Sequence, residues 1–265
     1  MSVGRILPIC SSVALACLAV SALVASAFPV WVLAVALALY LAIVVAGVLN
    51  PRLSMFAAIV SRAVGNRPEI ALTFDDGPSP LSTPKVLAEL ARHNARATFF
   101  VLGAKAEEHP DVLRAIHQAG HEIGLHGYQH DRLLSLRHPK RIVADLERGL
   151  SFIQTTTGRT PRLFRPPVGH TSPRTAEAAR RLGLVIVGWS VRARDGLAGT
   201  TAAAVVRRVT SRLVPGAIVL LHDASERDRY EPAGVAALPQ ILLEVSKQGL
   251  VCVTVSEALS RHGHA

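Results

Sequence analysis

The sequence predicts an α/β fold in which a parallel sheet is covered by crossover helices, preceded by an apolar segment that enters a membrane. After residue 68, short apolar runs alternate with longer segments of helical periodicity. This regular alternation is typical of strand–helix units, which build parallel sheets. Seven candidate strands in about 195 residues suit a small barrel or a doubly wound sheet.

The membrane segment is predicted from an uninterrupted apolar run. No charged residue occurs from Ile6 to Pro51, and the stretches at about 6–28 and 30–49 are each long enough to cross a bilayer. Phe28-Pro29 marks a break between them. We therefore expect a two-helix hairpin with a tight connection within residues 1–50.

A cleaved signal peptide is the competing interpretation of this segment. Arg5 precedes an apolar core, and Ala25-Ser26-Ala27 has the small residues of a cleavage site. In that case the second apolar stretch still anchors the mature protein. Membrane attachment follows from either interpretation.

The side of the membrane that carries the soluble part is left open. Arg52, Arg62 and Arg67 follow the second stretch, and Arg5 precedes the first. With two spans, the positive-inside rule places both ends in the cytoplasm. A cleaved signal, or a single true span, places the soluble part outside.

Charge and cysteine content narrow the class of partner. The net charge of +10 favours an anionic membrane surface, an acidic substrate or nucleic acid. Nucleic acid is not expected, because basic residues are scattered, Trp31 and Trp189 are the only tryptophans, and no nucleic-acid-binding motif occurs. Cys10 and Cys17 lie in the membrane segment and Cys252 is alone in the soluble part, so no disulfide framework is implied.

The soluble part is divided into three by composition: a juxtamembrane linker at 51–68, the folded domain at 69–257 and a tail at 258–265. The candidate strands are Ile70–Phe74, Ala97–Val101, Glu122–Leu125, Leu163–Arg165, Leu184–Trp189, Ala217–Leu221 and Leu250–Thr254. The candidate helices lie near 82–93, 106–118, 139–157, 173–182, 200–213 and 234–247. Glycines just past several of these stretches are typical helix stop signals.

Two adjacent acids follow the first strand. Asp75 and Asp76 lie in the run TFDDGPS, directly before a Gly-Pro turn. Carboxylates at one strand end repel each other, so a metal or an arginine has to hold both ionised, or one takes up a proton. A solvated turn with helix-capping acids is the plain alternative.

Two histidines follow the third strand. His126 and His130, in HGYQH, are four residues apart and share one face if the loop is helical there. With one carboxylate they predict a metal site that leaves coordination positions open for water and substrate. The carboxyl ends of strands meet at one mouth of a barrel, so the histidines are expected beside the acids.

Three further strand ends contribute polar or aromatic side chains. Arg165 begins the stiff run RPPVG, in which Gly169 allows close approach to a ligand and a backbone N–H can face a developing oxyanion. Trp189 ends the fifth strand, where a lone tryptophan is commonly a core residue. His222 ends the sixth and is placed to act as a general acid.

These motifs resemble those of the NodB-homology polysaccharide deacetylases, carbohydrate esterase family four, over roughly residues 68–257. Five motifs occur in the order of that family: TFDDGPS (73–79), HGYQH (126–130), RPPVG (165–169), WSVRARD (189–195) and LLHD (220–223). The resemblance implies the family's irregular (β/α)7 barrel, preceded here by transmembrane helices. It also implies a hydrolase that acts on non-peptide carbon–nitrogen bonds.

The resemblance implies roles for four catalytic residues. Asp75 is the general base that takes the proton of the attacking water, and Arg165 orients Asp75. His222 protonates the leaving amine, and Asp195 tunes His222. An amide carbonyl is a poor electrophile, so this chemistry needs help from a metal ion.

A metal site and a substrate wall complete the implied set. The residues implied to hold one divalent metal ion are Asp76, His126 and His130. Zinc is expected first, with cobalt, nickel or manganese as alternatives. The residues implied to form the substrate wall and the oxyanion hole are Val168, Trp189 and Leu220.

Three positions depart from the usual family pattern. Gly127 stands where the family more often has Ser or Thr, Val168 where Tyr is common, and Gly196 where a second Trp is usual. None of these changes removes a reacting group. We therefore expect an active enzyme with an altered substrate pocket.

The expected function is a membrane-anchored hydrolase that removes N-acetyl groups from amino sugars of a cell-wall or exopolysaccharide glycan at a bacterial inner or plasma membrane. An alternative is a deformylase or deacetylase of a lipid-linked sugar at the inner leaflet, which the arginines after the second stretch favour. An inactive carbohydrate-binding or scaffold protein is a third, against which the complete set of reacting positions argues. The glycan and the oligomeric state are left open.

Overall fold

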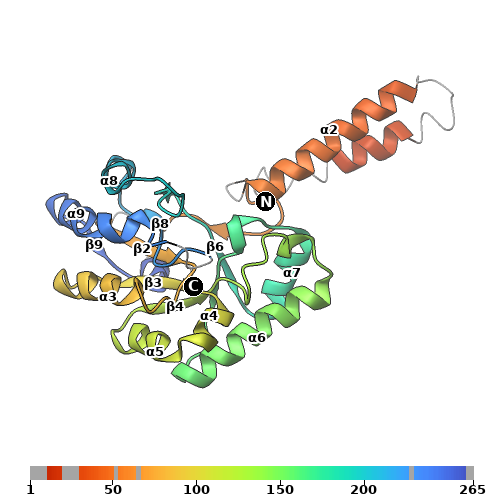
Figure 1. The fold of residues 1–265 in the computed structure, drawn as a ribbon. Coiled ribbons are helices and arrows are strands. Elements are labelled where there is room, and N and C mark those ends of the chain that lie inside the picture. The colour runs from red at the N-terminus through yellow and green to blue at the C-terminus, as the bar shows by residue number, and fades with distance from the viewer. Residues whose placement is uncertain (1–10, 20–29, 51–52, 64–66, 227–229, 261–265) are drawn as a thin grey trace.

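A curled parallel sheet forms the centre of the molecule (Figure 1). The computed structural model describes residues 11–19, 30–50, 53–63, 67–226 and 230–260. Within these residues the sheet has nine strands in the order β1-β6-β5-β4-β3-β2-β8-β7, and β9 also pairs with β2. The strands are β1 (Ile59–Val60), β2 (Glu69–Asp75), β3 (Ala97–Val101), β4 (Glu122–Leu125), β5 (Leu163–Phe164), β6 (Val185–Val187), β7 (Val191–Arg192), β8 (Ile218–His222) and β9 (Val251–Cys252).

Helices cover the outside of the curled sheet (Figure 1). They are α3 (Thr83–Arg92), α4 (Gly103–Glu108), α5 (Pro110–Gln118), α6 (Pro139–Thr157), α7 (Pro173–Arg181), α8 (Ala202–Thr210), α9 (Ala233–Lys247) and α10 (Val255–Ser260). Every residue of β2 and β3 is buried, as expected for central parallel strands covered on both faces. The core includes the stacked rings of Phe74 and Phe99, whose centroids are 5.1 Å apart.

The predicted α/β class with parallel strands is confirmed, and the expected irregular (β/α)7 barrel is a curled half-barrel in the structure. All strand pairs in the described sheet are parallel, and its edge strands β1 and β7 do not pair with each other. An isolated antiparallel bridge between Arg62 and Ala217 joins the segment after β1 to the start of β8. Five strands are only two or three residues long, too short to continue the ladder around a full barrel.

Three element boundaries also differ from the sequence prediction. Part of the expected linker at 51–68 is strand β1, which pairs with β6. The expected helix at 106–118 is two helices, α4 and α5, because Pro110 lacks the N–H needed to continue α4 and instead starts α5. Part of the expected tail at 258–265 lies in helix α10.

The register of the strands places the candidate reactive side chains at one edge of the sheet. Asp75, at the end of β2, is paired with Phe100 on β3 and with His222 on β8. The strands run in the same direction, so their carboxyl ends meet at the same mouth of the half-barrel.

The N-terminal helix α2 (Val30–Leu49) projects away from this domain (Figure 1). It is the one helix within the described residues that is long and apolar enough to cross a membrane, and almost none of it is buried. Residues 11–19 are also helical, and the Ser12 hydroxyl donates to the Tyr40 hydroxyl on α2 at 3.3 Å. The predicted break at Phe28-Pro29 and most of the first stretch lie outside the described residues.

Candidate active site

The two adjacent aspartates point to different partners. Asp75 is the last residue of β2, and Asp76 follows with φ 71°, in the left-handed region. Oδ1 of Asp75 accepts a hydrogen bond from Arg165 at 2.6 Å. Oδ1 of Asp76 lies 3.5 Å from Nε2 of both His126 and His130. The left-handed turn therefore directs these two neighbouring carboxylates to different partners.

The loop that carries the two histidines is not helical, so the predicted shared helical face is wrong. Gly127 (φ 87°) and His130 (φ 53°) are left-handed and fold the loop back on itself. Carbonyls of Gly127 and Tyr128 accept from the backbone N–H groups of residues 103 and 104, and Tyr128 N–H donates to Asp145 at 2.8 Å. The rings of His126 and His130 still meet, with centroids 5.2 Å apart.

Both imidazoles present Nε2 to Asp76, and a hydrogen bond fixes the ring of His126. Nδ1 of His126 lies 2.7 Å from the backbone carbonyl of Arg165, so Nδ1 carries the proton and the Nε2 lone pair is available. Burial lowers the pKa of His126 despite the nearby carboxylates, which keeps the ring neutral. Nδ1 of His130 lies 3.3 Å from Oε1 of Glu226.

Asp76, His126 and His130 fit a divalent metal ion. Their donor atoms all lie within 4.8 Å of one another, and all three residues are buried. The buried Oδ1 of Asp76 has no hydrogen-bond partner among the described residues. Ligands about 2.1 Å from a tetrahedral metal are separated by about 3.4 Å, close to the 3.5 Å between Asp76 and each histidine.

Arg165 is fully buried behind the aspartates, and each nitrogen of its guanidinium group donates a hydrogen bond. Nη1 donates to Asp75 at 2.6 Å and to the Thr73 hydroxyl at 2.8 Å. Nη2 donates to the Gly188 carbonyl at 2.9 Å, and the guanidinium lies 4.1 Å from the centroid of the Phe100 ring. This network locks Asp75 Oδ1, so the other carboxylate oxygen faces the metal site.

His222 faces the site from β8 and is paired with a buried carboxylate. Oδ1 of Asp195 lies 2.9 Å from Nδ1 of His222, while Oδ2 accepts the His222 backbone N–H at 2.8 Å. Burial disfavours the charged imidazole, but Asp195, with further contributions from Asp76 and Asp75, outweighs it and raises the pKa of His222 to about 9. The imidazole is therefore protonated at neutral pH.

The remaining predicted residues line the pocket above these groups, which has a volume of about 170 Å³. Trp189 and Leu220 are buried in its wall, and Val168 is 37% exposed at its rim. Val168 has φ 53°, a strained conformation for a β-branched residue, which commonly marks a functional loop. All ten predicted site residues thus converge, and their roles in a reaction stay predictions.

Glu226 and Tyr230 are among the pocket residues that the sequence analysis does not predict. Glu226 supports His130 and also accepts from Nε of Arg132 at 3.1 Å. Tyr230 lines the pocket and donates to the Gly196 carbonyl. Both lie in the loop after β8, and the only sequence signal was an acid four residues after His222.

Comparison with known proteins agrees with this geometry. The model of the family described as polysaccharide deacetylase matches residues 62–187. A peptidoglycan-N-acetylglucosamine deacetylase of Bacillus cereus is 38% identical over 201 residues, which are 75% of this chain and 91% of that protein. A chitooligosaccharide deacetylase of Sinorhizobium fredii is 33% identical, over 72% of this chain and 92% of that protein.

A solved structure of a similar protein also matches the fold. The crystal structure of a peptidoglycan N-acetylglucosamine deacetylase superposes with a TM-score of 0.71 and 30% identity. The match covers 76% of this chain and 92% of that one.

Proposed function

The chain belongs to the polysaccharide deacetylase family of carbon–nitrogen hydrolases, and on this premise we propose that it removes the N-acetyl group from amino sugars of a cell-wall or exopolysaccharide glycan. The observation that carries the proposal is the division of labour between neighbouring acids. Asp75 is held by Arg165, Asp76 faces the imidazoles of His126 and His130, and a protonated His222 lies across the same pocket.

A divalent metal held by Asp76, His126 and His130 would act as a Lewis acid on the acyl oxygen and lower the pKa of the attacking water. We propose zinc for this donor set. Cobalt, nickel and manganese accept the same ligands.

The chain's own residues then handle the protons. Oδ1 of Asp75 is occupied by Arg165, so Oδ2, which lies 3.8 Å from His126 Nε2, takes the proton of the attacking water. His222 carries a proton and gives it to the departing amine, because an amine anion is too basic to leave unprotonated. The backbone N–H of Val168 would donate to the developing oxyanion.

We propose that α2 anchors the enzyme in a bilayer. Its side chains are largely exposed, for example Leu39 at 62%, so it is not a core helix of the soluble domain. A reporter fused after Ala265 determines the side of the membrane. A periplasmic signal supports action on a cell-wall or exported glycan, whereas a cytoplasmic signal favours a lipid-linked sugar at the inner leaflet.

The activity is tested with purified full-length protein loaded with zinc. We expect acetate and free amine in equal amounts from N-acetylated peptidoglycan glycan or chitooligosaccharide. Absence of both products from every N-acylated amino sugar offered, with the metal present in the protein, would contradict the proposal and favour an inactive carbohydrate-binding protein.

A further inference from the structure

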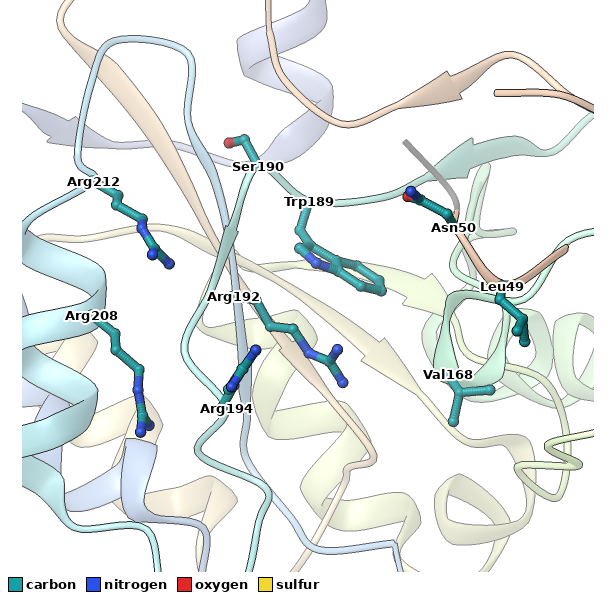
Figure 2. A pocket seen from close by; sticks show the side chains of 9 residues that line it. All are labelled: Leu49, Asn50, Val168, Trp189, Ser190, Arg192, Arg194, Arg208 and Arg212. Carbon is teal, nitrogen blue, oxygen red and sulfur yellow. The ribbon is translucent and has the colours of Figure 1, made fainter. Parts of the chain in front are cut away.

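A second cavity, of about 760 Å³, opens beside the active site and carries four arginines (Figure 2). Its basic residues are Arg192, Arg194, Arg208 and Arg212. We refer to it as the arginine cavity. Basic residues are scattered along the sequence, and the fold gathers these four around one cavity.

Two segments of the chain, one at the end of β7 and one at the end of α8, supply these four arginines. Arg192 ends β7 and Arg194 follows with a left-handed backbone (φ 58°), and both are exposed on either side of the buried Ala193. Arg208 lies in the last turn of α8, and Arg212 follows two residues after the end of that helix. Figure 2 shows Arg208 and Arg212 at one side of the cavity and the other two arginines near its middle.

The charges of these arginines are not compensated by protein carboxylates. Within the part of the chain that the structure describes, none of the four forms an ion pair. Arg208 donates to the Ala193 carbonyl at 3.3 Å, and Arg192 lies 5.8 Å from the centroid of the Trp189 ring. Like charges that line one cavity repel each other, and a bound anion would offset this repulsion.

The location of the cavity links the active site to the membrane helix. Arg192 and Arg194 also line the catalytic pocket, as does Trp189. The opposite side of the arginine cavity is formed by Leu49 and Asn50, at the end of α2 (Figure 2). An anionic group bound there would lie between the reacting acyl group and the bilayer.

We propose that the arginine cavity binds the phosphate or diphosphate that joins the substrate amino sugar to a membrane lipid. A single carboxylate ligand has too few oxygens to pair with four guanidinium groups. A phosphate or diphosphate has more oxygens, and these accept forked hydrogen bonds from several arginines. This inference rests on the proposed deacylase activity and defines its substrate class: a sugar that is still phosphate-linked to lipid.

Binding of two soluble probes tests the inference in full-length, metal-loaded protein. N-acetylglucosamine 1-phosphate and the methyl glycoside of N-acetylglucosamine, both as the same anomer, differ only in the group on the anomeric oxygen, which is phosphate in one and methyl in the other. Calorimetry measures the binding of both. We expect the 1-phosphate to bind about ten- to a hundredfold more tightly. Arg208→Ala/Arg212→Ala should abolish this preference, whereas Arg207→Ala, an exposed neighbour on α8 outside the cavity, should keep it.

Equal binding of the two sugars by the wild type, or a preference that survives Arg208→Ala/Arg212→Ala, overturns the inference. The inference is also overturned if the protein prefers bilayers of phosphatidylglycerol to bilayers of phosphatidylcholine but shows no preference for the sugar phosphate. That result assigns the cavity to lipid headgroups. Acetate release from chitooligosaccharide is measured in parallel. If the wild type releases acetate but does not prefer the sugar phosphate, the inference fails and the proposed function stands. If the wild type binds the sugar phosphate but releases no acetate from any substrate, the proposed function fails.

Discussion

Replacing Asp195 by Asn should lower the pKa of His222 and with it the activity above neutral pH. Asp195 is fully buried and holds His222 at Nδ1 and at the backbone N–H. Asn has nearly the same shape, but it removes the negative charge that offsets the burial of the imidazole. The variant therefore separates the electrostatic effect of this carboxylate from its packing.

The magnitude follows from the raised pKa. The difference between 6.5 and about 9 corresponds to about 3 kcal/mol in favour of the protonated imidazole, and we take about 2 to 3 kcal/mol because 21% of the side chain is exposed. Without Asp195 the pKa should fall to about 6.5 or below. At about pH 7.5 only about a tenth of the imidazoles would then be protonated, so kcat/KM should fall about tenfold from this cause alone.

Two measurements check this expectation. The alkaline limb of the pH profile of kcat/KM should move from near 9 toward 6.5 in Asp195→Asn, and NMR titration of the His222 ring in metal-free protein should give the same displacement. If the alkaline limb and the titration both stay near 9 in the variant, Asp195 does not set the charge of His222. Retention of wild-type activity at about pH 8 would refute the general-acid role.

The pH dependence of the unfolding free energy tests the charge of His222 independently of activity. The pKa of His222 is higher in the folded than in the unfolded protein, so its contribution to the free energy of unfolding is complete below pH 6.5 and disappears as pH rises through about 9. The difference in unfolding free energy between wild type and Asp195→Asn should narrow over the same interval. Urea denaturation at a series of pH values measures it.

Three further changes test other parts of the site. Arg165→Met leaves a buried carboxylate without its partner, so urea denaturation should show a loss of about 3 to 5 kcal/mol, and Arg165→Lys should restore little because it lacks the planar fork. Glu226→Gln removes the charge beside Nδ1 of His130, so metal titration should show about 10- to 100-fold weaker affinity, and unchanged affinity would exclude this support. Gly77→Ala places a Cβ 2.2 Å from Oδ2 of the buried Asp223, so thermal unfolding should show a loss of about 1 to 3 kcal/mol; a wild-type Tm would contradict this packing.

The central strands and the site residues were accessible from sequence because their signals are local. Ala97–Val101 and Glu122–Leu125 are strands with the predicted bounds, since each is an apolar run closed by turn residues. Reactive side chains follow directly on such strands, and parallel packing alone brings them together.

The features that could not be predicted from the sequence depend on tertiary contacts. Strands β1 and β7 have two residues each and no periodicity of their own. The convergence of His126 and His130 depends on left-handed backbone in the loop rather than on helical spacing. The arginine cavity joins two pairs from different elements, and only the packed fold places them around one hollow.

Metal content and acetate release, measured together in Asp75→Asn and Asp76→Asn, test the division of labour between the two acids most directly. We predict that Asp75→Asn keeps the wild-type metal content and loses roughly 10²–10⁴-fold in rate, and that Asp76→Asn loses both metal and activity. Loss of metal from Asp75→Asn, or wild-type acetate release by it, would contradict the account.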